Sequence, residues 1–221
     1  MGAPAKKEVY ASTFFLEVCK MKLEEMLELK PSETLLLVID VQRDFMEVTS
    51  GFTFFDANDH NADMCSMVVE HLIPLVQRSL EEKAHVVYVQ AIYKEGKFLP
   101  PYDQLCSKSP GKDFCIIDNV HGINKVRIFE KHEYDPFTNP DLRRFIDENR
   151  VKALILTGVT LTHCISAATD SALLIPNLAV VVPEDCVGYR HQREADAQRI
   201  LDGYKAGNRV VVVNSGQIKY K

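Results

Sequence analysis

The stretch TLLLVIDVQRDF, residues 34–45, predicts the fold class of the chain. Its first six residues, 34–39, are rich in Leu, Val and Ile without polar alternation, which is typical of a β-strand covered on both faces. Similar runs recur at residues 85–90, 153–157, 179–183 and 209–214, with a weaker run at 126–130. Helical patterns separate the runs, at residues 63–82, 140–148, 163–174 and 192–204. This alternation predicts an α/β fold with three α/β/α layers around a six-stranded, mostly parallel, Rossmann-like sheet.

Residues 34–221 are predicted to form a single domain, which is the usual organisation at this length. Residues 1–33 are predicted to be an N-terminal helical extension that ends at Pro31. Its apolar residues recur near helical spacing after a possible cap at Ser12: Phe15, Val18, Leu23, Met26 and Leu27. An extension with this apolar face suggests a homo-oligomer, and a monomeric mass by light scattering at micromolar concentration would refute that expectation.

Composition and charge exclude several classes of protein. The chain has 31 acidic and 26 basic residues and a formal net charge of −5, which gives nucleic acid no basic surface. No run approaches the ~20 apolar residues that a membrane-spanning helix needs. The N-terminal MGAPAKKEVYAS has no apolar segment of the kind a secretory signal requires, and the six cysteines form no CxxC pair, so free thiols are expected. These features predict a cytoplasmic protein with no nucleic-acid and no membrane partner.

The connection at residues 91–125 is too long for a plain turn. It is punctuated by Gly96, Pro100-Pro101, Pro110-Gly111 and Gly122. Long connections in compact domains are usually functional or disordered. We expect this one to form the wall of a pocket.

Reactive side chains follow three of the predicted strands. Asp40 closes the first strand, Lys131 follows the weak strand, and Cys164 lies where the helix after strand 153–157 begins. The carboxyl ends of parallel strands meet at one edge of the sheet, where ligands bind. Taken singly, Asp40 is typical of a turn, Lys131 of a surface charge and Cys164 of a small buried side chain. Together, beside a helix N-terminus that lowers the pKa of a thiol, they indicate a cysteine hydrolase.

Three segments of the chain resemble the isochorismatase-like cysteine hydrolases. They are LLLVIDVQRDF at residues 35–45, FEKHEYDPF at 129–137 and LILTGVTLTHCISAATDSAL at 154–173. The family includes nicotinamidases, N-carbamoylsarcosine amidases, and biuret and ureidoacrylate amidohydrolases. The resemblance covers roughly residues 34–214. It implies a hydrolase that cleaves a C–N bond in a small-molecule amide or ureide, without a cofactor.

The resemblance also implies the roles of individual residues. Asp40, Lys131 and Cys164 match the catalytic triad of the family, in which Asp40 takes the thiol proton and Lys131 helps to hold the ion pair. The thiolate of Cys164 would attack the carbonyl carbon and form a thioester. The backbone N–H groups of Thr160 and Cys164 would form the oxyanion hole. The family also places a cis peptide in this loop, which corresponds here to Val159–Thr160.

Some positions near the nucleophile depart from the family pattern. Leu161 and Thr162 stand where members often have Thr followed by Asp or Asn, so substrate contacts by these side chains are not expected to carry over. His163 precedes the nucleophile directly, and neighbouring helical residues point about 100° apart, so it is expected at the rim or in a structural role. Phe45 is predicted to bind substrate. Phe52, Phe54 and Phe55 could line a pocket for a flat small molecule together with Phe45. The alternative for all four side chains is packing in the core.

We expect no metal ion in this protein. Nicotinamidases bind a metal through a D-x-H segment and a distant histidine, whereas the nearest stretch here, residues 56–60, has Asn58 in place of the first histidine. Read as an EF-hand that starts at Asp56, the stretch has Met67 at the twelfth position instead of glutamate. The expected absence of a metal disfavours a nicotinamidase.

Three other functions remain open at this stage. A protein of the same fold that binds partners without turnover is possible, because a fold does not determine a function. A vinyl-ether hydrolase of the isochorismatase type is a second alternative. Such enzymes do not need a cysteine nucleophile, so the presence of Cys164 favours amide or ureide hydrolysis. A thiol redox sensor would need a second cysteine near Cys164, and Cys186 follows the next strand.

Overall fold

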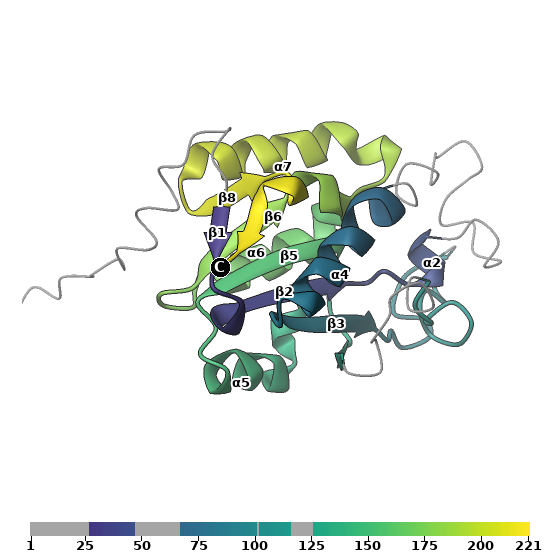
Figure 1. Cartoon of the computed structure of the whole chain (residues 1–221). Coiled ribbons are helices and arrows are strands. Elements are labelled where there is room, and N and C mark those ends of the chain that lie inside the picture. Colours follow the sequence, from purple (N-terminus) through teal and green to yellow (C-terminus); the bar gives the residue numbers. More distant parts are fainter. Residues whose placement is uncertain (1–26, 47–66, 101, 116–125) are drawn as a thin grey trace, which may run out of the picture.

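The computed structural model describes residues 27–46, 67–100, 102–115 and 126–221, and a central β-sheet dominates it (Figure 1). Six strands cross this sheet in the order β4-β3-β2-β5-β6-β8, and the short β7 pairs with β5. All described pairs in the sheet are parallel. The predicted fold class is confirmed, with β7 as an addition to the expected six strands. The strands are β2 (Thr34–Ile39), β3 (His85–Ala91), β4 (Arg127–Lys131), β5 (Ala153–Val159), β6 (Ala179–Pro183), β7 (Val187–Gly188) and β8 (Val210–Val213).

Helices cover both faces of the sheet and produce the three layers. Leu36 and Val38 of β2 belong to one apolar cluster, together with residues of α4 (Ile73–Glu81). Leu35 and Leu37 of the same strand belong to the opposite cluster. That second cluster contains residues of α5 (Pro140–Glu148), α6 (Ser166–Ala172) and α7 (Glu194–Gly207). Because both faces of β2 are buried, its sequence is apolar throughout rather than alternating.

The strand β4 explains why one of the six sequence runs is weak. It lies at the edge of the sheet, and of its five residues only Phe129 and Lys131 are buried. An edge strand with one exposed face needs fewer apolar residues than a central strand. The strand runs one residue further than predicted and ends at Lys131.

The described end of the predicted N-terminal helix is a strand, not a helix. Residues 1–26 lie outside the described residues. Leu27–Leu29 form β1, which pairs in parallel with β9 (Ile218–Tyr220). Leu27 and Leu29 are buried in the core and Glu28 between them is exposed, so a two-residue alternation overrides the helical spacing at this point. This end of the extension therefore contributes to the core of the domain.

The helix predicted at residues 63–82 is divided in two parts. A π-type turn, Val68–Leu72, precedes α4, and Pro74 lies in the first turn of α4. Proline is tolerated there because the first turn needs no intrahelical N–H donor. The sequence also predicts a kink at Pro74, which lies inside the apolar pattern, and the helix type changes just before it. Residues 63–66 lie outside the described residues. Within the described part of the chain, no helix has both the length and the apolar character needed to cross a bilayer.

The order of the strands creates a switch point at β2 and β5. The chain runs outward from β2 to β3 and β4, and then returns to place β5 on the other side of β2. Helices on either side of such a point leave a crevice at the carboxyl ends of the two strands. Asp40 follows β2 and Cys164 follows β5 at this crevice.

Candidate active site

The structure brings Asp40, Lys131 and Cys164 together from three segments of the chain. Asp40 directly follows β2, Lys131 is the last residue of β4, and Cys164 lies in the π-type turn Leu161–Ile165 after β5. Lys131 Nζ lies 2.8 Å from Asp40 Oδ2, and both side chains are fully buried. The Asp40 and Lys131 side chains each influence the pKa of the Cys164 thiol as hydrogen-bonding neighbours. The three residues singled out in the sequence therefore form one buried cluster.

Both charges of the ion pair are buried. Burial raises the pKa of Asp40, and the charge of Lys131 opposes this shift. Burial works against the charge of Lys131, but the attraction of Asp40 and Cys164 outweighs it, so the pKa of Lys131 is raised. Asp40 is consequently a stronger proton acceptor than a carboxylate in water, and Lys131 stays an ammonium.

The Cys164 thiol is protonated in the resting site. Burial and the negative charge of Asp40 raise its pKa to about 12, while Lys131 acts in the opposite direction. A thiolate at Cys164 therefore forms only when a neighbouring base removes the proton. The buried carboxylate of Asp40 is a hydrogen-bonding neighbour of the thiol.

Backbone donors lie beside the nucleophile. The Val159–Thr160 peptide is cis, as the sequence resemblance implies. The N–H of Thr160 has no backbone acceptor among the described residues, and Cys164 is the fourth residue of its turn, where N–H groups lack the regular intrahelical acceptor. Both predicted donors of the oxyanion hole are thus located at the same turn as the thiol.

Gly158 permits the close approach of β5 to β2 just before this turn. Its φ is +105°, a conformation that side-chain-bearing residues rarely adopt. A Cβ at this position would lie 2.0 Å from the carbonyl oxygen of Ile39. Glycine therefore allows the segment that carries the thiol to lie against the segment that carries Asp40.

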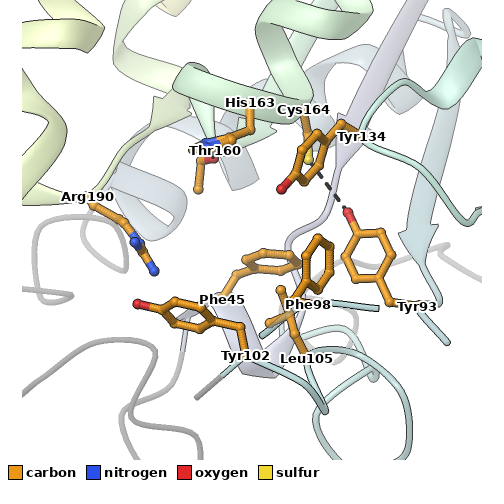
Figure 2. A pocket seen from close by; sticks show the side chains of 10 residues that line it. All are labelled: Phe45, Tyr93, Phe98, Tyr102, Leu105, Tyr134, Thr160, His163, Cys164 and Arg190. Carbon is orange, nitrogen blue, oxygen red and sulfur yellow. Dashed lines mark hydrogen bonds between the residues drawn. The ribbon is translucent and has the colours of Figure 1, made fainter. Parts of the chain in front are cut away.

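A pocket with aromatic walls opens onto Cys164 (Figure 2). Its empty space is about 590 Å³, including the open mouth. Tyr93, Phe98, Tyr102 and Leu105 come from the long connection that was predicted to wall a pocket, and that prediction is confirmed for its described part. Residues 101 and 116–125 of the connection lie outside the described residues. The remaining lining residues are Phe45, Tyr134, Thr160, His163, Cys164 and Arg190.

Two of the lining residues correspond to sequence predictions about the pocket. Phe45 lines it, at the place expected for a substrate contact. His163 also lies at the pocket and packs near the ring of Tyr134, with 5.3 Å between ring centroids, which agrees with the expected rim position. Burial and the positive charges of Arg193 and Arg190 lower the pKa of His163. Phe52, Phe54 and Phe55 lie outside the described residues.

Gln42 and Asp44 hold the pocket wall in place, a role that the sequence reasoning missed. The amide of Gln42 accepts from the N–H of Ala91 at 2.8 Å and donates to the carbonyls of Ala91 and Lys112 at 2.8 and 2.7 Å. Asp44 Oδ2 accepts from the N–H of Cys106 at 2.7 Å. Both residues lie within the segment 35–45 that resembles the family. The resemblance therefore marked these two positions, but nothing in the sequence assigned them a structural role.

The described residues provide no ligand set for a metal ion. Among them, no group of three or more His, Cys, Asp and Glu side chains is arranged to hold a metal. The segment at residues 56–60, considered in the sequence as a metal-binding stretch, lies outside the described residues.

Comparison with known proteins identifies the family. The model of the isochorismatase domain matches residues 34–214, and the chain belongs to the isochorismatase family of hydrolases. A search of curated proteins found no match.

Solved structures share the fold of this chain. A cysteine hydrolase from Pseudomonas syringae pv. phaseolicola has a TM-score of 0.68 at 20% identity, covering 90% of this chain and 95% of its own. The pyrazinamidase of Pyrococcus horikoshii, solved in complex with zinc, has a TM-score of 0.66 at 20% identity, covering 82% and 99%. The N-carbamoylsarcosine amidase from Thermoplasma acidophilum has a TM-score of 0.64 at 19% identity, covering 83% and 96%.

Proposed function

We propose that this protein hydrolyses a C–N bond of a small amide or ureide through a thioester on Cys164. The observation that carries the proposal is the position of the Cys164 thiol, which lies beside the buried Asp40–Lys131 pair and faces an open pocket. The similarity to structures described as a pyrazinamidase and an N-carbamoylsarcosine amidase supports amide chemistry. The presence of the cysteine favours it over a vinyl-ether hydrolase.

The first half of the reaction forms the thioester. Asp40 accepts the proton of the Cys164 thiol, and the ammonium of Lys131 stabilises the resulting thiolate. The sulfur attacks the carbonyl carbon, and the oxyanion accepts hydrogen bonds from the N–H groups of Thr160 and Cys164. Asp40 then returns its proton to the leaving nitrogen as the C–N bond breaks, which releases ammonia or an amine.

The second half regenerates the thiol. Asp40, again a carboxylate, accepts a proton from water as the water oxygen attacks the thioester. The C–S bond breaks, and the sulfur leaves as a thiolate that recovers the proton from Asp40. The raised pKa of Asp40 suits it to both directions of proton transfer, because a buried carboxyl exchanges protons nearer to neutral pH.

The lining of the pocket favours a small, flat substrate. Phe45, Phe98 and Tyr102 present aromatic rings to the pocket that Cys164 lines (Figure 2). Flat ligands gain from stacking on such rings. A free space of this size suits a single small molecule better than a polypeptide chain.

Ammonia release from a panel of small amides and ureides tests the proposal. The panel contains nicotinamide, biuret, ureidoacrylate, N-carbamoylsarcosine and simple carbamoyl amino acids. We expect turnover by the wild type, loss of turnover in Cys164→Ala, and retention in Cys186→Ala, a buried cysteine outside the pocket. Turnover that persists in Cys164→Ala would contradict the thioester mechanism. No turnover of any compound, together with a Cys164 inert to alkylation, would favour a binding protein.

A further inference from the structure

Tyr93 places a hydroxyl group between the nucleophile and the ammonium of the site. It lies two residues beyond the end of β3, and 2% of its surface is exposed. Tyr93 Oη is 3.9 Å from Cys164 Sγ (Figure 2). It is 3.5 Å from Lys131 Nζ. Neither the sequence motifs nor the mechanism above uses this residue.

Three acceptors lie closer to the ammonium of Lys131 than the Tyr93 hydroxyl does. Lys131 Nζ lies 2.8 Å from Asp40 Oδ2, 2.9 Å from the carbonyl oxygen of Tyr134 and 3.2 Å from that of Glu133. An ammonium has three N–H groups, and these three acceptors are all closer than the Tyr93 hydroxyl. Lys131 Nζ also donates to Tyr93 Oη at 3.5 Å, which leaves the hydroxyl hydrogen of Tyr93 available. The Tyr93 hydroxyl remains as a donor that can point at the sulfur.

The ring of Tyr93 is held in a fixed orientation. It packs edge-to-face on Phe98, with centroids 5.0 Å apart, and the ammonium of Lys97 lies 5.3 Å from its centroid. Its backbone N–H donates to the carbonyl of Cys106 at 3.3 Å. A donor held in place before the charge develops stabilises that charge without reorganisation.

We propose that Tyr93 is a further catalytic residue whose hydroxyl donates a hydrogen bond to the thiolate of Cys164. The inference rests on the proposed thioester mechanism and adds one group to it. The hydroxyl keeps its proton throughout, so Asp40 alone exchanges protons with the thiol, the leaving nitrogen and water. Burial and the neighbouring charges of Asp40 and Cys164 raise the pKa of Tyr93, which keeps the hydroxyl protonated. Hydrogen bonds from a fixed donor to an anionic sulfur are of the charge-assisted kind.

Site-resolved alkylation tests the proposal without a substrate. Wild type, Tyr93→Phe and Tyr88→Phe are treated with iodoacetamide at pH 8, and the modification of Cys164 is followed by peptide mass spectrometry. Tyr88→Phe is the matched control because Tyr88 is fully buried on β3, and its hydroxyl has no hydrogen-bond partner among the described residues. Below the thiol pKa the rate follows the thiolate fraction. Loss of a hydrogen bond to a charged group should lower the rate for Tyr93→Phe roughly 10- to 100-fold, with Tyr88→Phe unchanged.

Two further readouts separate catalysis from packing. With any substrate that the panel yields, kcat should fall in Tyr93→Phe while KM stays the same, because the hydrogen bond forms only with the charged sulfur. Site-specific 3-fluorotyrosine at position 93 strengthens the donor at nearly constant shape and should raise the alkylation rate of Cys164. Thermal unfolding of each variant verifies its fold, and the fluorotyrosine protein serves if Tyr93→Phe does not fold.

The outcomes distinguish this inference from the proposed function. Equal alkylation rates for wild type and Tyr93→Phe, or no rise with fluorotyrosine, would overturn the role of Tyr93 and leave the triad intact. A Cys164 that never reacts in the wild type, together with no turnover, would overturn the proposed function itself. An unchanged kcat with a raised KM would assign Tyr93 to substrate contact instead.

Discussion

The charges of Asp40 and Lys131 depend on each other. Their side chains are fully buried and 2.8 Å apart, so removal of one leaves the other as an isolated charge. Replacing one partner of such a pair costs about 3–5 kcal/mol of unfolding free energy. We expect Lys131→Met to lose about this amount in urea denaturation. The double variant Asp40→Asn, Lys131→Met should recover most of it, and additive losses would show that the two charges are not coupled.

Asp40 also controls the titration of the thiol. Its negative charge is one cause of the raised pKa of Cys164, after burial. Asp40→Asn removes that charge, so the thiol pKa should fall below about 12. The same change removes the base, and turnover should fall on the order of 100- to 10,000-fold. The pH dependence of Cys164 alkylation reports the thiol pKa, and kcat reports the turnover. Measured together, they check that Asp40→Asn lowers both. An upward shift of the titration would contradict it.

The residues of the site differ in how well the sequence reveals them. Asp40, Lys131 and Cys164 stand within segments of distinctive pattern, and each lies at or after the end of a predicted strand. Tyr93 has no such pattern. Its hydroxyl lies near the sulfur because the loop after β3 turns toward the crevice. No residue pattern in the sequence predicts the path of that loop.

At the level of elements, the loop that walls the pocket depends on one close contact. Gly111 lies against the carboxylate of Asp44, and a Cβ there would be 2.1 Å from Asp44 Oδ1. Gly111→Ala would displace this carboxylate from the N–H of Cys106. We expect a loss of about 1–3 kcal/mol of unfolding free energy and weaker substrate binding.

A second glycine gives the control for this prediction. Gly203 lies on the exposed side of α7 with open space around its Cα. Gly203→Ala should raise the unfolding free energy by roughly 0.5–1 kcal/mol, because alanine favours a helix. Equal responses of the two variants in urea denaturation would contradict the packing of Asp44 against Gly111.

The elements also show where sequence patterns fail. The central strand β2 was predicted with its observed bounds, because both of its faces are apolar. The segment Leu27–Leu29 was predicted as helix because Leu27 continued a helical spacing, whereas its pairing with β9 depends on a strand almost two hundred residues away. Pairings at such distances leave no local signal in the sequence.

At the scale of the whole molecule, the two-stranded sheet of β1 and β9 joins distant parts of the chain. Ile218 pairs with Leu27 and is buried in the same core cluster. Ile218→Ala should cost about 2–5 kcal/mol of unfolding free energy, as for other large-to-small changes in a core. Lys219→Ala, at the exposed neighbouring position, should change it by less than about 0.5 kcal/mol. Because neither residue lines the pocket, kcat should be the same in both variants. A similar, small loss in the two variants would contradict a structural role for this sheet.

The topology of the whole sheet assembles the site. The switch point between β2 and β5 brings Asp40 and Cys164 to one crevice, and the pairing of β3 with β4 brings Lys131 to the same edge. The central claim is that a substrate carbonyl becomes attached to Cys164 there. Trapping of the acyl group by hydroxylamine tests this claim most directly, with two substrates that share an acyl group but release different amines. We predict that both give the same ratio of hydroxamate to acid, because both pass through one thioester. A ratio that depends on the leaving amine, or hydroxamate formation that persists in Cys164→Ala, would contradict the account.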